Sequence, residues 1–300
     1  MRIPRWSPGS YRTLTLAALI ALGVIVVTGA AVRLTGSGLG CPQWPNCDPG
    51  HLAPHGDTGY HGYIEFVNRV FTGVVSVLVV LAVLGSLRRA PRRTDLTWLS
   101  VGLVLGVVGQ IVLGALVVVF DLSPRLVIAH FVVSMLLVAD GVILHHRAGL
   151  PDGARLVPAV AAPVARMGWV LLVMCAVAIG AGTVVTGAGP HGGDTDVRRL
   201  GFAVTDVARI HGIAVMLFLG AVLFTLRLVN RTGSSPSVRH DATVLLAVLC
   251  AQATVGYVQY FSGVPVVLVA VHIVGAVSVW AATLHFVLEL RVPASTATPG

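Results

Sequence analysis

The segment "QIVLGALVVVFDLSPRLVIAH", residues 110–130, decides the fold, because it has a counterpart 142 residues later. That counterpart, "QATVGYVQYFSGVPVVLVAVH" at 252–272, repeats a Gln, a Gly four residues on, a turn, and a His twenty residues after the Gln. "RLTGSGLG", after the first apolar segment, likewise resembles "VVTGAGPHGG" after the fifth. Similarity at a fixed spacing indicates an internal repeat. We therefore predict two related halves, residues 1–150 and 151–300.

Each half contains four apolar segments of the length, about 20 residues, that crosses a bilayer. The chain is 56% hydrophobic and 11% charged, which excludes an ordinary soluble domain. Four spans per half is an even number, so the halves are related by an axis along the membrane normal. We predict an all-α polytopic membrane protein with two pseudo-symmetric four-helix bundles in parallel repeat. The predicted spans lie near 13–32, 66–87, 97–119, 126–148, 167–186, 208–229, 242–261 and 265–290.

The segments outside the spans carry the topology signal. The first span has no clear cleavage pattern after it, which favours a retained helix over a signal peptide. The Pro- and Gly-rich linker "AGLPDGARLVPAVAAPVAR", residues 148–166, is expected to connect the halves without a fold of its own. All 20 basic residues are Arg. Most fall on one side of the predicted spans, which makes both termini cytoplasmic by the positive-inside rule. The opposite side has only Arg33, Arg69, Arg125, Arg198, Arg199 and Arg209.

This distribution also explains the net charge of +8, because Arg-rich loops lie beside an anionic inner leaflet. We therefore expect the lipid bilayer as a partner and no nucleic acid.

Two of the four cysteines, Cys41 and Cys47, lie in the first outer loop. An outer loop faces an oxidising compartment, which favours a disulfide over free thiols. Five intervening residues and the lack of a second pair make a zinc site less suitable. Cys175 and Cys250 lie within spans and are expected to be small core hydrophobes.

Three histidines, His130, His211 and His272, lie within spans near their outer ends. An ionisable side chain in a membrane is by default a functional hypothesis, although a neutral His bonded across helices is the simpler alternative. His211 and His272 occupy equivalent places on two helices of one half, so they are candidates to bind a haem iron from both sides. Zinc or copper would need three or four converging ligands, and no further ligand is expected at that depth.

The first half departs from this pattern, because Asn68 stands in the place that corresponds to His211. Glu65 and Asn68 share a helix face, and Arg69 lies one turn from Glu65. A plain Glu65–Arg69 ion pair at a helix end is the alternative to a functional role. The remaining histidines are expected mostly at the surface: His51, His55, His61 and His191 in outer loops and His145, His146 and His240 at the cytoplasmic rim. His285 is expected to be a packed core residue.

Together these motifs resemble the haem A synthase family. The resemblance covers nearly the whole chain: "RLTGSGLGCPQWPNC" at 33–47, Glu65-x-x-x-Arg69, the Gln-to-His segments, and one His in each of the fourth, sixth and eighth helices. It implies oxidation of a methyl group of haem O to the formyl group of haem A, with a haem b cofactor in the second half. It implies that His211 and His272 are the axial ligands of that haem, that Glu65 and His130 serve the substrate, and that Cys41 and Cys47 can form a disulfide.

The resemblance has one gap: the family has His where this chain has Asn68. An amide cannot replace imidazole as a strong iron ligand. Either His130 holds the substrate haem from one side, or His61, two turns before Asn68, replaces the missing ligand. We favour His61 slightly. Arg69, Arg125 and Arg209 are candidates to pair with haem propionates.

The resemblance also implies a bacterial cell membrane, haem sites toward the extracytoplasmic side, haem O synthase as a partner, and an unidentified electron donor or acceptor. A di-haem electron-transfer protein without a chemical substrate is the main alternative function. A transporter is a third reading, suggested by the parallel repeat.

Overall fold

The computed structural model describes residues 5–56 and 59–294 and has eight long helices in that part of the chain. They are α1 (Pro8–Leu34), α2 (Tyr60–Arg88), α3 (Thr94–Val119), α4 (Pro124–Gly149), α5 (Ala162–Ala188), α6 (Val204–Arg231), α7 (Pro236–Phe261) and α8 (Val266–Glu289). Each is long and apolar enough to cross a membrane. All eight predicted spans are thus confirmed as helices.

Local sequence explains where several helices begin. Ser7 and Ser235 accept hydrogen bonds from backbone N–H groups of the first turns of α1 and α7. Pro lies at the first or second position of α1, α4, α5 and α7, where its missing N–H costs nothing. α2 begins at Tyr60 and not near residue 66. His61, expected in an outer loop, therefore lies in the first turn of α2, and Glu65 and Asn68 lie well inside the helix.

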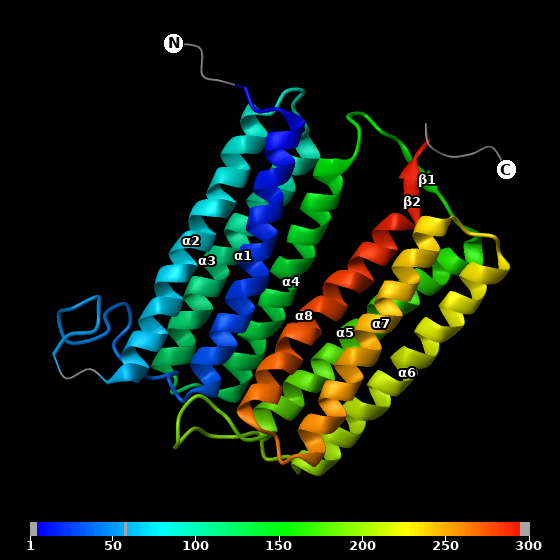
Figure 1. The fold of residues 1–300 in the computed structure, drawn as a ribbon. Coiled ribbons are helices and arrows are strands. Elements are labelled where there is room, and N and C mark those ends of the chain that lie inside the picture. Colours follow the sequence, from blue (N-terminus) through cyan, green and yellow to red (C-terminus); the bar gives the residue numbers. More distant parts are fainter. Residues whose placement is uncertain (1–4, 57–58, 295–300) are drawn as a thin grey trace.

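The helices form two four-helix bundles, α1 to α4 and α5 to α8, which lie side by side in Figure 1. In the first bundle α1 and α3 each contact α2 and α4, so α2 and α4 are diagonal. In the second, α5 and α7 each contact α6 and α8, so α6 and α8 are diagonal. The repeat thus places equivalent helices in equivalent positions.

The two bundles meet chiefly through α4 and α8. Trp280 on α8 donates a hydrogen bond through its indole N–H to the backbone oxygen of Met135 on α4, at 2.9 Å. On either side of this contact, α1 packs against α8 and α5 packs against α4. These two contacts are equivalent, because α1 corresponds to α5 and α4 to α8 in the repeat. This is the pattern of a pseudo-twofold axis that passes between α4 and α8.

The two ends of the molecule differ. The beginning of α1, the end of α8 and the linker lie at one end, which we call the terminal end (Figure 1). The loops after α1, α3, α5 and α7 lie at the other, the loop end. Large apolar side chains such as Val70, Leu105 and Leu217 are exposed on the outer faces of the helices, as lipid contact requires.

The linker has more structure than the sequence indicates. Strand β1 (Leu156–Pro158) pairs antiparallel with β2 (Arg291–Pro293), which follows α8. Asp152 forms an ion pair of 2.8 Å with Arg89, whose side chain is 1% exposed. The prediction of a linker without a fold of its own is therefore wrong, because it treated the segment as isolated although its partners lie far away in the chain.

Candidate functional site

His211 on α6 and His272 on α8 face each other across the diagonal of the second bundle. Their ring centroids are 6.3 Å apart and their planes are nearly perpendicular. His211 lies in the third turn of α6 and His272 in the second turn of α8, both counted from the loop end. The two rings therefore share one depth in the bundle.

A glycine on the neighbouring helix lies beside each of the three histidines within spans. A Cβ added to Gly182 would lie 3.1 Å from Cε1 of His211, and one added to Gly256 would lie 2.9 Å from Cε1 of His272. In the first half, a Cβ on Gly114 would lie 3.5 Å from Cε1 of His130. These glycines make room for the imidazole against the helix backbone. The sequence shows the Gln-to-Gly spacing, but it does not show that the glycine makes room for a His on the neighbouring helix.

The glycine also exposes the backbone of the preceding turn. Nδ1 of His211 lies 3.0 Å from the backbone oxygen of Ala178, four residues before Gly182. A bond donated by Nδ1 fixes the tautomer and leaves Nε2 as the nitrogen free to bind a metal. His272 and His130 have their Nδ1 atoms buried without a hydrogen-bond partner in the described part of the chain.

The glutamines of the repeat hold the backbone of two of these histidines. Nε2 of Gln110 donates to the backbone oxygen of His130 at 3.0 Å, and Nε2 of Gln252 donates to that of His272 at 2.8 Å. Each glutamine thus links its helix to the next one at the level of the His. The twenty-residue spacing from Gln to His therefore records a direct contact.

The separation of His211 and His272 fits one kind of group well. Two imidazoles that bind one metal from opposite sides, through bonds of about 2 Å, have ring centres about 6 Å apart. Bis-His ligation from facing helices is typical of a low-spin haem in a helical bundle. The donor set of the second half therefore fits a haem iron.

The first half has one imidazole at the corresponding depth. His130 lies in the second turn of α4, and Asn68 lies in the third turn of the diagonal helix α2. Oδ1 of Asn68 accepts a hydrogen bond of 2.8 Å from Oγ1 of Thr28 on α1. Among the described residues of this half, His130 is the only His at this depth. The first half therefore offers one strong iron ligand where the second offers two.

Glu65 and Arg69 attach the disulfide loop to α2. Glu65 is 5% exposed, and its Oε2 accepts a bond of 2.8 Å from the backbone N–H of Cys41. Its Oε1 accepts from the guanidinium of Arg69, with a shortest distance of 2.5 Å. Arg69 in turn donates to the backbone oxygens of Cys41, Pro45 and Asn46. The ion pair that was the simpler alternative in the sequence is present, and it is a buried clamp.

The loop itself is closed by the Cys41–Cys47 disulfide, which confirms that prediction. His61 packs against the start of this loop, and its Nδ1 lies 2.9 Å from Oγ of Ser37. At 1.5 Å per residue, His61 lies about 10 Å closer to the loop end than Asn68. His61 therefore contacts the start of the loop, on the loop-end side of Asn68.

The arginines proposed for propionates differ in availability. Arg69 is engaged by Glu65 and three loop carbonyls, whereas Arg125 and Arg209 are exposed near the starts of α4 and α6. Sequence reasoning passed over a second basic group at the loop end. Arg33 donates to the backbone oxygen of Thr186 across the two halves, at 2.9 Å.

Arg33 lines a cavity of about 20 Å³ between the halves. Arg198 and Arg199 line it too, from the loop that follows α5. Partial burial lowers the pKa of Arg199 from its usual value. In the sequence, the only sign of this group of arginines was the adjacent pair Arg198 and Arg199, on the side of the membrane that has few Arg residues.

Two smaller expectations are wrong. Cys250 is exposed on α7 and is not a core residue, whereas Cys175 is buried as expected. The side chain of His285, in the last turns of α8, is 53% exposed and is not a packed core residue. Among the loop histidines, His191 has a defined contact, since its Nε2 lies 2.9 Å from the backbone oxygen of Val264.

Comparison with known proteins adds independent evidence. Residues 12–190 match the family described as "COX15-CtaA: Cytochrome oxidase assembly protein". The chain is 39% identical over 132 residues to "Heme A synthase" of Shouchella clausii, an alignment that covers 43% of each protein. It is 33% identical over 135 residues to "Heme A synthase" of Bacillus pumilus, over 44% of this chain and 43% of the relative. The chain thus spans less than half the length of the curated relatives that it matches.

Proposed function

Because the chain belongs to the COX15-CtaA family of cytochrome oxidase assembly proteins, we propose that it is a haem A synthase. In this proposal it oxidises a methyl group of haem O to the formyl group of haem A. The single observation that carries the proposal is the pair His211 and His272, whose ring centres are 6.3 Å apart on diagonal helices. The names of the two relatives agree with it.

The cofactor in this proposal is a haem b held in the second half. His211 and His272 would bind its iron through Nε2, and Gly182 and Gly256 give the two rings the space they need. A bound haem supplies the electron-transfer and oxygen chemistry that side chains lack. The chain supplies the ligands, the dry apolar surroundings and the orientation.

The substrate, haem O, is proposed to bind in the first half at His130. Asn68 faces this site from the diagonal helix and offers an amide, which does not bind iron strongly. Arg125 is proposed to pair with a propionate of haem O, and Arg209 on α6 with a propionate of the cofactor haem. We no longer favour His61 as the second ligand, because it lies about 10 Å closer to the loop end than Asn68.

Glu65 is the proposed general base or water-orienting group. An ionised carboxylate has about four acceptor positions. The N–H of Cys41 and the guanidinium of Arg69 use three of them. In this proposal the carboxylate accepts a hydrogen bond from water, or takes a proton, near the reacting methyl group.

Sidedness and partners complete the proposal. We propose that the loop end faces the extracytoplasmic side of a bacterial cell membrane, with both termini cytoplasmic. The Arg distribution and a disulfide at the loop end support this orientation. Haem O synthase, as the source of the substrate, and an electron donor or acceptor are proposed partners.

The test is pigment analysis of the purified protein and its His272→Ala variant. We expect haem b together with haem O or haem A in the wild type, and loss of haem b in the variant, read by optical spectra and chromatography. Haem b without haem O or haem A would favour the di-haem electron carrier. Absence of all haem would overturn the proposal and favour a transporter.

A second comparison decides the ligand on the substrate side. We expect His130→Ala to abolish formation of haem A, His61→Ala to reduce it partly through the loop, and His55→Ala to leave it unchanged. If His61→Ala is as inactive as His130→Ala and also alters the spectrum of bound haem O, His61 is the second ligand.

A further inference from the structure

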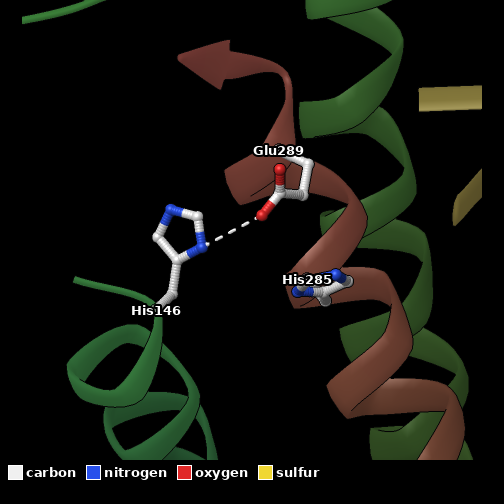
Figure 2. Close-up of side chains that lie close together, drawn as sticks. All are labelled: His146, His285 and Glu289. Carbon is white, nitrogen blue, oxygen red and sulfur yellow. Dashed lines mark ion pairs between the residues drawn. The ribbon is translucent and has the colours of Figure 1, made fainter. Parts of the chain in front are cut away.

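A second cluster of metal-binding side chains lies at the terminal end, far from the proposed haem sites. Figure 2 shows His146 from the last turn of α4 beside His285 and Glu289 from the last turns of α8. One ligand atom from each residue lies within 4.8 Å of those of the other two. Within residues 5–56 and 59–294, no other three His, Cys, Asp or Glu side chains form such a group.

The spacing of these residues is suited to a shared ligand. His285 and Glu289 are four residues apart, so they lie on the same face of α8. Nδ1 of His146 lies 3.3 Å from Oε1 of Glu289. Ligand atoms bound to one tetrahedral ion through bonds of about 2 Å lie about 3.4 Å apart. His146 and Glu289 therefore already have the required separation, and the exposed His285 is free to approach.

The charged groups around these three residues also matter for binding a cation. Oδ1 of Asp241 on α7 lies 4.0 Å from Nε2 of His285, which is within ion-pair distance but too long for a hydrogen bond. The other oxygen of Asp241 and Nε2 of His146 are buried without hydrogen-bond partners in the described structure. The two carboxylates oppose the positive charges of Arg12 and Arg147 nearby, and Arg147 is itself paired with Asp95 at 3.4 Å.

We propose that His146, His285 and Glu289 form a binding site for a divalent transition-metal ion, with zinc as the best match. Two His and one Glu form a common zinc ligand set, and the exposed side of the cluster leaves a fourth position for water. The site joins α4 to α8 where the two halves meet. It goes beyond the proposed function, since none of its residues belongs to the haem sites.

The test is zinc binding by the purified, tag-free, full-length protein in detergent. After equilibration with zinc and removal of the excess, we expect one bound equivalent by elemental analysis and a higher Tm with zinc than with a chelator. In the Glu289→Gln and His285→Ala variants we expect at least tenfold weaker binding and no zinc-dependent change in Tm. His240→Ala, which removes an exposed His on α7, is the matched control and should bind like the wild type.

Three results would overturn the site: a wild type without bound zinc, equal binding by all the proteins, or binding that disappears only in His272→Ala. Glu289→Gln keeps the shape of the side chain, so it tests the site even if His285→Ala does not fold. Haem content is measured on the same samples. A failure of the metal site is thereby separated from a failure of the haem proposal.

Discussion

The two halves have the same arrangement of four helices and differ at the position of His211 in the second half and Asn68 in the first. In the second half, both diagonal helices carry a His, and a glycine lies beside each ring. In the first half, the diagonal partner of His130 is Asn68, and a disulfide loop clamped by Glu65 and Arg69 lies above it. Two imidazoles can bind a haem iron from both sides, whereas one imidazole leaves the other side of the iron open. Under the proposed function, one bundle design would serve the cofactor in the second half and the substrate in the first.

The strongest test of this comparison exchanges the residues at the two positions that differ, His211 and Asn68. His211→Asn gives the second half the ligand pattern of the first, and we expect its haem b content to fall more than about tenfold, because loss of even a supporting residue of a metal ligand costs about tenfold or more. The reciprocal Asn68→His restores the residue that the resemblance expects at this position, so it should hold haem O by two imidazoles and add a low-spin signal from the first half. Haem content, low-spin spectra and haem A formation measure both effects.

The control for this exchange is His240→Asn, a surface change that should alter neither spectrum nor haem content. Unchanged haem b in His211→Asn would contradict the assignment of the second half. A lack of any low-spin signal in Asn68→His would show that Asn68 and His130 do not face one site.

The second-largest effect is expected at Glu65 and Arg69, which attach the disulfide loop to α2. We expect Glu65→Gln to lower haem A formation about 100-fold, because the side chain can no longer take a proton, while haem b in the second half is retained. Arg69→Gln disturbs the same loop but keeps the carboxylate, so it should lose less activity. Equal losses in the two variants would mean that the pair acts only as a clamp. Asp121→Asn, at an exposed carboxylate of the loop end, is the control.

A graded effect is expected from the three glycines beside the histidines. A Cβ would approach His272 most closely, at 2.9 Å, then His211 at 3.1 Å, then His130 at 3.5 Å. Gly256→Ala should therefore disturb the haem b spectrum most, Gly182→Ala less, and Gly114→Ala should change substrate binding only slightly. Gly180→Ala, where a Cβ meets nothing within 4 Å, is the control on α5. The reverse order would show that the glycines do not set the ring positions.

The smallest effect is expected from the repeated glutamines. Gln252→Leu removes the bond to the backbone of His272, but it also removes an Oε1 that is buried without a partner in the described chain. Loss of the hydrogen bond destabilises the fold, whereas removal of the unpaired oxygen stabilises it. The free energy of unfolding should therefore change by no more than about 1 kcal/mol.

Gln110 also bonds Oγ of Ser134, so Gln110→Leu should cost more than Gln252→Leu. Tm values measure both. Gln259→Leu, which removes another buried Oε1 without a partner in the described chain but touches no backbone of these histidines, should be neutral or stabilising. A destabilisation of several kcal/mol in Gln252→Leu would contradict this account.

Much of the fold was predictable, because length, apolarity and repetition are properties of sequence. The eight spans followed from the length of the apolar segments, and the two bundles and the equivalence of the Gln-to-His segments followed from the repeat at 142 residues. The disulfide followed from the side on which Cys41 and Cys47 lie.

What could not be predicted depends on contacts between distant residues. The pairing of Leu156 with Pro293 joins segments that have no local signal for each other. The cluster of His146 with His285 and Glu289 exists only because α4 and α8 meet. Glu65 was recognised as important, but its bond to the N–H of Cys41 depends on how the loop folds back onto α2.

The pairing of β1 with β2 has a consequence for chain topology. It brings the entry and the exit of the second bundle to one point, since residues 156–158 lie beside residues 291–293. A polypeptide with adjacent ends can be cut and rejoined elsewhere without altering its contacts. The second bundle is therefore suited to circular permutation, with its present ends joined near the β1–β2 pair and new ends placed in a loop.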